Sequence, residues 1–351
     1  MAGASLAAAL VAADAGLRVV LVEAESQPGY HATGRSAAFW TESYGGPGVQ
    51  PLTTASGPDL RALGVLHPRG GLTIARQGQE AELASFARRF AELGVRVEMQ
   101  NRAEIAARVP GLRKEWVAGA LEPDCCDIDV AALHQHYLGQ AARAQVPVLC
   151  SAGLTGAMRQ GDGWGLRLAD GRGIAAHVLV NAAGAWADGV AAMAGAAPLA
   201  IQPYRRTVAQ LRVSPAAAAD LPLVLDLGEG FYFKPESGRL WLSPHDETPS
   251  LPCDAAPEEL DVALAIARLE GVVDWRIAVV EHRWAGLRSF APDRLPVYGF
   301  DPHVPGFFWF AGQGGFGIQT APAAARLAAG LLLGQAGGAI DPAPYAPARF
   351  Y

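Results

Sequence analysis

The sequence opens with MAGASLAAALVAADAGLRVVLVEAE, residues 1–25. Residues 2–15 have the composition of a helix, and residues 17–22 read as a buried strand that ends in an acid, Glu23. A helix that leads into an acid-tipped strand is the second half of a dinucleotide-binding βαβ unit, in which the acid binds ribose hydroxyls. Gly3 then corresponds to the last glycine of a G-x-G-x-x-G turn. On these residues alone, an ordinary packed helix and strand remains the alternative.

Length and composition limit the classes of protein that remain. A chain of 351 residues exceeds what one hydrophobic core usually holds, so two packed units are expected. The net charge of -6 argues against a nucleic-acid partner, and no apolar run predicts a membrane span. The four cysteines lack metal-ligand spacing. We therefore expect reduced thiols, no metal site and a cytoplasmic protein.

The middle of the chain has the pattern of an antiparallel sheet. Residues 203–287 alternate like strands, with a helix expected over 257–270. Amphipathic spacing predicts a surface helix over 78–93. Asp129 is expected to cap the helix that follows it.

Pieces of a parallel βα fold lie on both sides of this region. A strand is predicted at 146–150, a buried strand at 174–181, and an apolar strand, a glycine-rich turn and a helix near the end of the sequence. We therefore predict an α/β protein, with a Rossmann-like domain interleaved with an α+β domain built on an antiparallel sheet. The expected boundaries assign 1–44, 130–198 and 288–351 to the first domain, and 45–129 and 199–287 to the second.

Three further segments strengthen the nucleotide hypothesis. In PGYHATGRSAA (28–38), Arg35 and Ser36 at a loop-to-helix junction offer a cation, a hydroxyl and helix N–H groups to a pyrophosphate; a capped helix with a surface arginine is the alternative. In VLVNAAGAWAD (178–188), small residues allow close approach to the backbone. In AGQGGFGIQTAP (311–322), four glycines precede a helix that directs its positive end at whatever lies before it.

Taken together, these motifs resemble the D-amino-acid oxidase-type, FAD-dependent amine oxidoreductase superfamily, and within it bacterial D-arginine dehydrogenase-like proteins. The similarity runs nearly end to end through seven ordered segments: QPGYHATGRSAA, DIDVAALHQHYL, VLVNAAGAWAD, QPYRRT, FYFKPESG, HRWAGLRSFAPD and FFWFAGQGGFGIQT. The resemblance implies a discontinuous FAD-binding domain and a second domain whose sheet roofs the flavin. Against that pattern the first strand of the dinucleotide fold is absent, and we expect the true start to lie upstream.

The resemblance implies a set of cofactor-binding residues. Carried onto this sequence, the FAD shell comprises Gly3, Glu23, Arg35, Ser36, Ala37, Leu154, Ala183, Gly184, Trp186, Gly315, Phe316, Gly317, Ile318, Gln319 and Thr320.

It also implies the residues that hold an amino-acid substrate. Arg288 would grip the carboxylate bidentately, since a guanidinium matches its geometry. Tyr232 would add a phenolic hydrogen bond and Arg206 a second cation, while Tyr44 would lie near the amine and Gly315 would offer its carbonyl to it. A salt bridge or a core tyrosine is the alternative for the first three. The implied reaction transfers a hydride from Cα to flavin N5, giving an imino acid and then a 2-oxo acid, with a quinone or other electron acceptor.

The sequence departs from the arginine-type enzymes at the side-chain pocket. Phe39 stands where they resemble one another in having a histidine, and Gly71 where they place an acid. Leu223 and Leu225 are expected to face the same pocket. We therefore predict D-amino acids with neutral or apolar side chains as substrates.

Two alternatives remain open. One is an oxidase of the same fold that acts on glycine or sarcosine-type amines with O2. The other is a truncated, non-catalytic remnant with impaired FAD binding. Peripheral attachment to the inner membrane is an alternative to a purely cytoplasmic location, and the sequence leaves the oligomeric state open.

Overall fold

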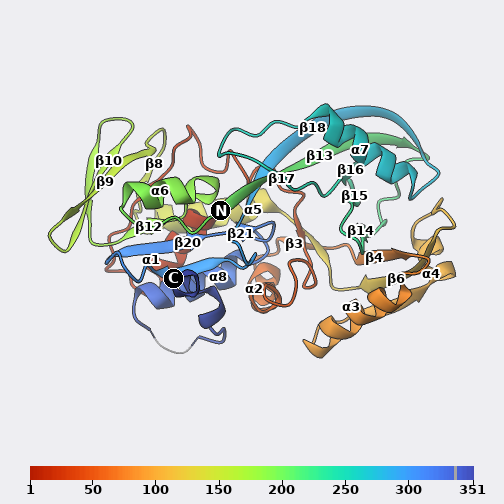
Figure 1. Cartoon of the computed structure of the whole chain (residues 1–351), viewed down its shortest axis with the longest axis horizontal. Helices are drawn as coiled ribbons and strands as arrows, with labels where there is room; N and C mark the ends of the chain where they lie inside the picture. Colours follow the sequence, from red (N-terminus) through yellow and green to blue (C-terminus); the bar gives the residue numbers. More distant parts are fainter. Residues whose placement is uncertain (336–337) are drawn as a thin grey trace.

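The computed structural model describes residues 1–335 and 338–351 and is elongated, with a lobe at each end of its long axis (Figure 1). No helix in these residues is both long enough and apolar enough to span a bilayer.

One lobe is built on a ten-stranded sheet. Its strands follow the order β21-β18-β13-β16-β15-β14-β4-β6-β5, with β17 on β13. Their bounds are β4 (Gly71–Arg76), β5 (Glu98–Asn101), β6 (Trp116–Glu122), β13 (Gln202–Ser214), β14 (Leu223–Asp226), β15 (Tyr232–Glu236), β16 (Arg239–Ser243), β17 (Thr248–Pro249), β18 (Arg276–Phe290) and β21 (Gln313–Gly314). The predicted antiparallel pairing is confirmed from β13 to β18, but β14 pairs with β4 in parallel.

Helices cover this sheet and close its core. They are α3 (Glu80–Glu92), α4 (Arg102–Arg108) and α7 (Glu259–Glu270). The predicted helices over 78–93 and 257–270 are thus confirmed. The core buries Trp116, Phe233 and Leu240, each at 0% exposure, beneath α4 and α7. Burial on this scale holds the sheet rigid, and the sheet in turn positions the side chains at its edge.

The other lobe contains the parallel pairs. They join β1 (Leu21–Val22) to β8 (Val148–Leu149), and β12 (Leu179–Asn181) to β20 (Phe307–Ala311). The remaining strands of this lobe are β9 (Leu154–Gln160), β10 (Gly163–Leu168), β11 (Gly173–Ala176) and β19 (Val297–Phe300). A small sheet between the lobes consists of β2 (Phe39–Trp40), β7 (Cys126–Ile128) and β3 (Leu66–Pro68).

The helices of this lobe pack around β12, β19 and β20. They are α1 (Ala2–Ala13), α2 (Gln50–Ala62), α5 (Val130–Arg143), η1 (Gly184–Trp186), α6 (Ala187–Met193), α8 (Ala321–Leu332), η2 (Ala343–Tyr345) and η3 (Pro347–Phe350). The side chain of Asp129 accepts a hydrogen bond from the backbone N–H of Ala132, as expected of the cap of α5. The mixed α/β fold is confirmed.

Three expectations about local structure are wrong. The strand expected over 17–22 is reduced to Leu21 and Val22 and is not buried, because only these two residues find partners, in β8. The single strand expected over 174–181 is two, because β11 pairs with β10 and β12 pairs with β20 in a different sheet. No helix follows Arg35 and Ser36, since the chain turns directly into β2.

Candidate active site

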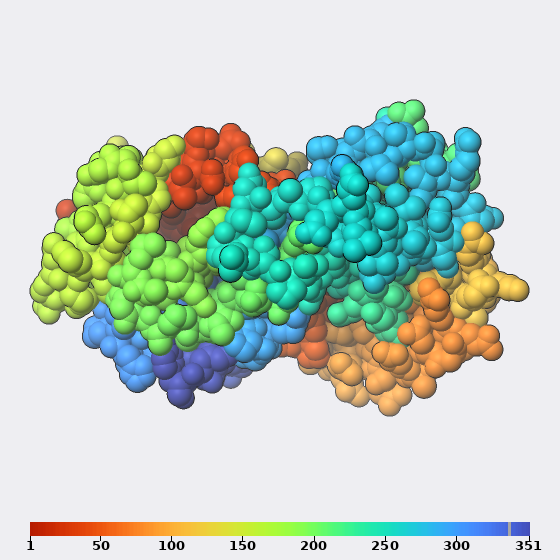
Figure 2. Space-filling view, turned by 45° about the horizontal axis from the view of Figure 1, so that its top comes forward, coloured from red at the N-terminus to blue at the C-terminus, as the bar shows by residue number. Residues whose placement is uncertain are grey.

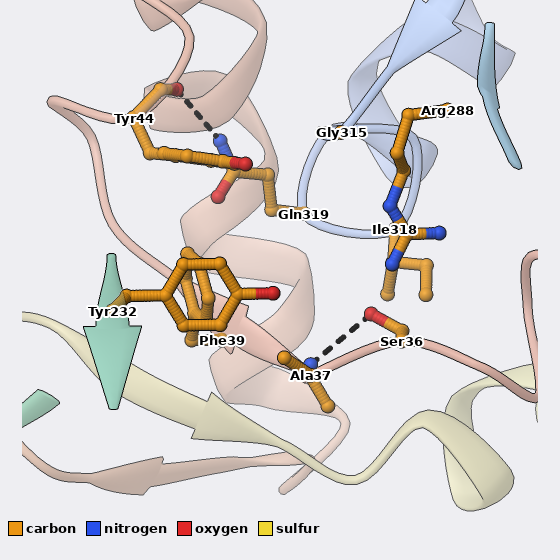
Figure 3. Close-up of a pocket in the computed structure, with 10 residues that line it drawn as sticks. Ser36, Ala37, Phe39, Tyr44, Tyr232, Arg288, Gly315, Ile318 and Gln319 are labelled. Carbon is orange, nitrogen blue, oxygen red and sulfur yellow. Dashed lines mark hydrogen bonds between the residues drawn. The ribbon is translucent and has the colours of Figure 1, made fainter. Parts of the chain in front are cut away.

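A pocket lies where the edge of the ten-stranded sheet meets the glycine-rich turn before α8. Its empty space is about 330 Å³, and it is lined by Ser36, Ala37, Ala38, Phe39, Tyr44, Tyr232, Arg288, Gly315, Ile318 and Gln319 (Figure 3). These residues come from distant parts of the sequence. The structure therefore brings together most of the residues expected to contact substrate and the end of the cofactor nearest to it.

Strand pairing explains how the segments meet. Near the end of β18, Ser289 pairs with Gly314 of β21, so the neighbouring Arg288 lies beside the glycine-rich turn. Tyr232 is the first residue of β15 and pairs with Leu225. Phe39 is the first residue of β2, and its ring lies 5.6 Å from that of Tyr232.

Arg288 is a buried cation without an anionic partner. It is 8% exposed, and its contacts are long ones to the carbonyl oxygens of Ala32 (3.5 Å) and Arg35 (3.4 Å). No carboxylate of the described residues lies within ion-pair distance of it. Burial lowers its pKa, because the low-dielectric interior disfavours the charged form. A buried charge is normally paired, so this guanidinium is suited to binding an anionic ligand.

The hydroxyl of Tyr232 and the guanidinium of Arg288 point into the same space from opposite sides (Figure 3). Tyr232 is 4% exposed, and burial raises the pKa of its phenol. The phenol therefore keeps its proton near neutral pH and can donate a hydrogen bond. Arg288 and Tyr232 together offer one oxygen-rich ligand group a charge and a neutral donor.

Arg206, expected as a second cation near the substrate carboxylate, lies behind the Tyr44 hydroxyl rather than in the pocket lining. Each of its three guanidinium nitrogens already donates a hydrogen bond to another residue. Nε donates to the carbonyl oxygen of Asp246 at 2.8 Å, Nη1 to the Tyr44 hydroxyl at 3.2 Å and Nη2 to Glu247 Oε1 at 3.0 Å. Arg206 therefore reaches the pocket only through Tyr44.

In the turn from Gly315 to Thr320, some residues line the pocket and others hold the segments around it in place. A Cβ on Gly315 would lie 2.8 Å from the Tyr44 hydroxyl oxygen, so only glycine fits beneath that ring. The Gln319 side-chain amide donates to the Tyr44 carbonyl oxygen at 3.2 Å and to Thr53 Oγ1 at 3.0 Å. Phe316 packs against Tyr44, and the Thr320 hydroxyl donates to the Phe316 carbonyl oxygen. Gly317 lies against the Gln313 side chain.

Sequence reasoning missed Glu122, a buried carboxylate at the end of β6. One oxygen, Oε2, accepts from the hydroxyls of Thr41 (2.6 Å) and Ser43 (2.7 Å). The other, Oε1, accepts from the Glu42 N–H at 2.6 Å. Glu122 thus ties residues 41–43, which lead into Tyr44, to the ten-stranded sheet. No sequence motif marks it, because only the folded loop brings its donors to it.

Sequence reasoning also missed His245, a buried histidine beside Tyr44. Its ring centroid lies 6.0 Å from that of Tyr44 and 5.7 Å from that of Tyr232. Neither its neighbours in sequence nor its spacing from other polar residues marks it.

The described fold also matches known proteins. The family model of FAD dependent oxidoreductases, DAO, covers residues 1–331. The chain belongs to this family. FAD is the cofactor of the family, in agreement with the expectation from the sequence.

Individual relatives of this DAO-family chain differ in their reactions. It is 31% identical to a glycine oxidase of Pseudomonas aeruginosa over 262 residues, 70% of this chain and 66% of that protein. It is 26% identical to hydrogen cyanide synthase subunit HcnC of the same organism, over 74% of this chain and 61% of that protein. The chain thus spans less than two thirds of the length of these relatives. An L-proline dehydrogenase from P. horikoshii shares the fold, with a TM-score of 0.86, 20% identity, and coverage of 99% of this chain and 94% of that one.

Several other residues expected to contact FAD lie on neighbouring segments of this DAO-family chain. The backbone N–H of Ala152 donates to the Glu23 carbonyl oxygen, so the acid-tipped strand lies beside the segment that leads into Leu154. A Cβ on Gly3 would lie 3.4 Å from Leu21 and 3.9 Å from Ala182. Figure 2 shows this face hollowed where the N-terminal segment, in red, meets segments coloured lime and green.

A further group of these residues lies between the turn after β12 and the pocket. Ala183, Gly184 and Trp186 form the turn after β12, and the Trp186 ring lies 4.8 Å from that of His31. The loop that carries His31 continues to Ser36 and Ala37 in the pocket wall. Gly184 has a φ of +55° and open space where a Cβ would be, which leaves its backbone accessible to a ligand.

Arg35 departs from its expected role at the pyrophosphate. Its guanidinium pairs with Asp254 and donates to the carbonyl oxygens of Ala255 (2.9 Å) and Ala285 (3.2 Å). It also lies over the ring of Tyr30, 5.1 Å from the centroid. Arg35 therefore ties the loop around residue 35 to the lobe that contains the ten-stranded sheet.

Proposed function

We propose that this protein oxidises D-amino acids with neutral or apolar side chains to imino acids, which water then hydrolyses to 2-oxo acids. The observation that carries this proposal is Arg288, a buried cation that faces Tyr232 across the pocket and has no anionic partner within residues 1–335 and 338–351. A planar guanidinium and a phenol together match an α-carboxylate. The glycine-rich turn on the same pocket supports a flavin site beside it.

The residues of the chain would mainly orient the substrate. Arg288 and Tyr232 would hold the carboxylate, and the Tyr44 hydroxyl and Gly315 carbonyl would face the amine, so that the hydrogen on Cα points at the glycine-rich turn. The pocket walls would exclude water while the amine is neutral. When bound, FAD supplies the acceptor for the hydride that leaves Cα. No side chain has to act as a base on carbon in this scheme.

We further propose which residues hold the cofactor and where the domains divide. Glu23, Gly3, Leu154 and the turn at 183–186 would hold the adenosine and pyrophosphate end. Ser36, Ala37 and residues 315–320 would contact the flavin end. The proposed domain division assigns residues 1–44, 130–198 and 288–351 to the FAD-binding domain and 45–129 and 199–287 to the substrate domain; α2, within 45–129, packs against α8 of the FAD-binding domain. The protein would act in the cytoplasm, and a quinone of the adjacent inner membrane or another non-oxygen acceptor would take the electrons.

Packing around Gly71 supports a preference for uncharged side chains. A Cβ on Gly71 would lie 3.2 Å from both Cβ and Sγ of Cys125, so an acid there would have to displace the Cys125 side chain. Leu223, Leu225 and Phe39 pack in one apolar cluster with Tyr232. Glu122 pairs with Gly71 across β4 and β6, but its carboxylate already accepts from Thr41, Ser43 and the Glu42 N–H, so a cationic side chain would have to compete with these donors. We expect D-Leu, D-Met and D-Phe each to exceed D-Arg in kcat/KM by about tenfold or more. A steady-state panel in which D-Arg is the best substrate would contradict this preference.

A glycine or sarcosine oxidase is the second candidate. Its support is the 31% identity to a glycine oxidase and the narrowing of the pocket by the Phe39 ring. Peroxide release under air, compared with turnover by an artificial dye, separates an oxidase from a dehydrogenase. Glycine or sarcosine exceeding every D-amino acid in kcat/KM would establish the second candidate.

The flavin itself provides the direct test of the proposed function. Purified protein, or protein mixed with FAD and then freed of unbound FAD by gel filtration, should show flavin absorbance bands, and a D-amino acid added anaerobically should bleach them. The matching L-amino acid is the control for stereochemistry. The absence of flavin bands even after FAD is added would instead favour a non-catalytic remnant.

A further inference from the structure

The Tyr44 hydroxyl has two polar neighbours behind the pocket wall. Arg206 Nη1 lies 3.2 Å from its oxygen, and His245 Nε2 lies 3.4 Å from it. Arg206 is 2% exposed, and the Tyr44 ring packs between Phe39, Phe316 and His245. The hydroxyl is therefore held on its protein side by one guanidinium and one imidazole.

The chemistry of these neighbours fixes the direction of both hydrogen bonds. A guanidinium can only donate, so the Tyr44 oxygen accepts from Arg206. His245 Nδ1 lies 2.8 Å from the carbonyl oxygen of Glu229, which can only accept. The ring proton therefore resides on Nδ1, and Nε2 carries a lone pair. The Tyr44 hydroxyl proton accordingly points at His245.

The surroundings of His245 keep its ring neutral. Its pKa is lowered to about 3, chiefly by burial and also by the nearby cations Arg206, Arg294 and Arg268, while the backbone carbonyl of Glu229 acts in the opposite direction. The other ionisable groups against its ring are the phenols of Tyr44 and Tyr232. The ring thus remains a hydrogen-bond acceptor at Nε2 at neutral pH.

We propose that His245 is a positioning residue that accepts the hydrogen bond of the Tyr44 hydroxyl, so that a lone pair of the Tyr44 oxygen faces the pocket as an acceptor for the substrate amine. This rests on the proposed function. The phenol oxygen has two lone pairs, one of which accepts from Arg206. The second is left for a donor in the pocket, and a substrate amine is a donor whereas its carboxylate is not. His245 would therefore help to determine which end of the amino acid faces Tyr44 and which faces Arg288.

Two variants separate the two nitrogens of His245. The residue has a φ of +54°, a conformation that asparagine tolerates. In His245→Asn the amide can still donate to the Glu229 carbonyl, but nothing reaches Tyr44. We expect kcat/KM to fall by about tenfold, as for the loss of one hydrogen bond. In His245→Gln the longer amide can accept from Tyr44, and kcat/KM should stay within about threefold of the unmodified protein.

A double-mutant cycle tests whether His245 acts through the Tyr44 hydroxyl. In a Tyr44→Phe background, His245→Asn should change kcat/KM by less than about twofold, because the shared hydroxyl is already gone. His303→Asn, at an exposed histidine, is the matched control and should leave kcat/KM unchanged in both backgrounds. An equal tenfold loss from His245→Asn in both backgrounds would overturn the proposal.

A second measurement does not depend on turnover. In the FAD-loaded protein with ¹⁵N-labelled histidine, the resonances lost in His245→Asn identify His245. They should show the proton on Nδ1, and Tyr44→Phe should shift the Nε2 resonance. Failure of every amine to reduce the flavin would refute the proposed function while leaving this spectrum as the test of His245. A proton on Nε2, or no shift in Tyr44→Phe, would overturn the positioning role.

Discussion

Replacement of Arg288 by methionine is expected to lower kcat/KM by about 10²- to 10⁴-fold, corresponding to the loss of about 3–5 kcal/mol of charge-assisted hydrogen bonding. Methionine keeps the length and much of the volume of the side chain but cannot bind a carboxylate. The stability of the protein without substrate should change in the opposite sense. Because Arg288 is a buried cation without an anionic partner, the unfolding temperature of Arg288→Met should be unchanged or higher.

Arg283 provides the matched control on the same strand. It is exposed and pairs with Glu259 only at 3.5 Å, so Arg283→Met should leave both kcat/KM and the unfolding temperature nearly unchanged. Arg288→Lys keeps the charge without the planar fork, and we expect an intermediate kcat/KM. A lower unfolding temperature together with undiminished activity in Arg288→Met would show that Arg288 serves the fold rather than the substrate.

Replacement of Glu122 by alanine is expected to lower the free energy of unfolding by about 2–5 kcal/mol, because buried donors lose their acceptor. The hydroxyls of Thr41 and Ser43 lie 3.3 Å apart and can bond to each other, whereas the backbone N–H groups of Glu42 and Ser43 lose the acceptor Glu122 supplies. The loop that presents Tyr44 should shift, and kcat/KM should fall by about 10- to 100-fold. Urea denaturation and steady-state kinetics measure the two effects.

Glu98, on the neighbouring strand β5, is the control for Glu122. Its carboxylate bonds only to Arg96 at the surface, so Glu98→Ala should change the free energy of unfolding by about 0.5 kcal/mol or less. Glu122→Gln retains one accepting oxygen and should fall between the unmodified protein and Glu122→Ala. Equal stability and activity of Glu122→Ala and Glu98→Ala would contradict the role of Glu122 in holding residues 41–43.

The fold class and the cofactor were predictable because their signals are local in the sequence. Period-two alternation between 203 and 287 depends only on which residues face the core, and it predicted the strands of an antiparallel sheet, in which β13 and β18 pair. The glycines of 311–322 also have a local cause, since Gly312 and Gly314 have φ values of +70° and +53°, a backbone conformation that favours glycine. The strand over 17–22 failed because a strand depends on its partner, and only two of its residues have one.

The roles of individual polar residues were not predictable in the same way. Arg35, Arg206 and Arg288 are equally basic in the sequence. In the structure, however, Arg35 forms an ion pair with Asp254 and Arg206 forms one with Glu247. Glu122 and His245 gained their partners, residues 41–43 and Tyr44, only on folding.

The sequence by itself determined the α/β fold, the family to which the chain belongs and hence its FAD dependence, because hydrophobic periodicity and glycine-rich turns are written in consecutive residues. Only the tertiary structure decided which buried charge is left without a partner. The free energy of a buried charge depends on the groups that surround it in space, and those groups come from segments that are distant in the chain.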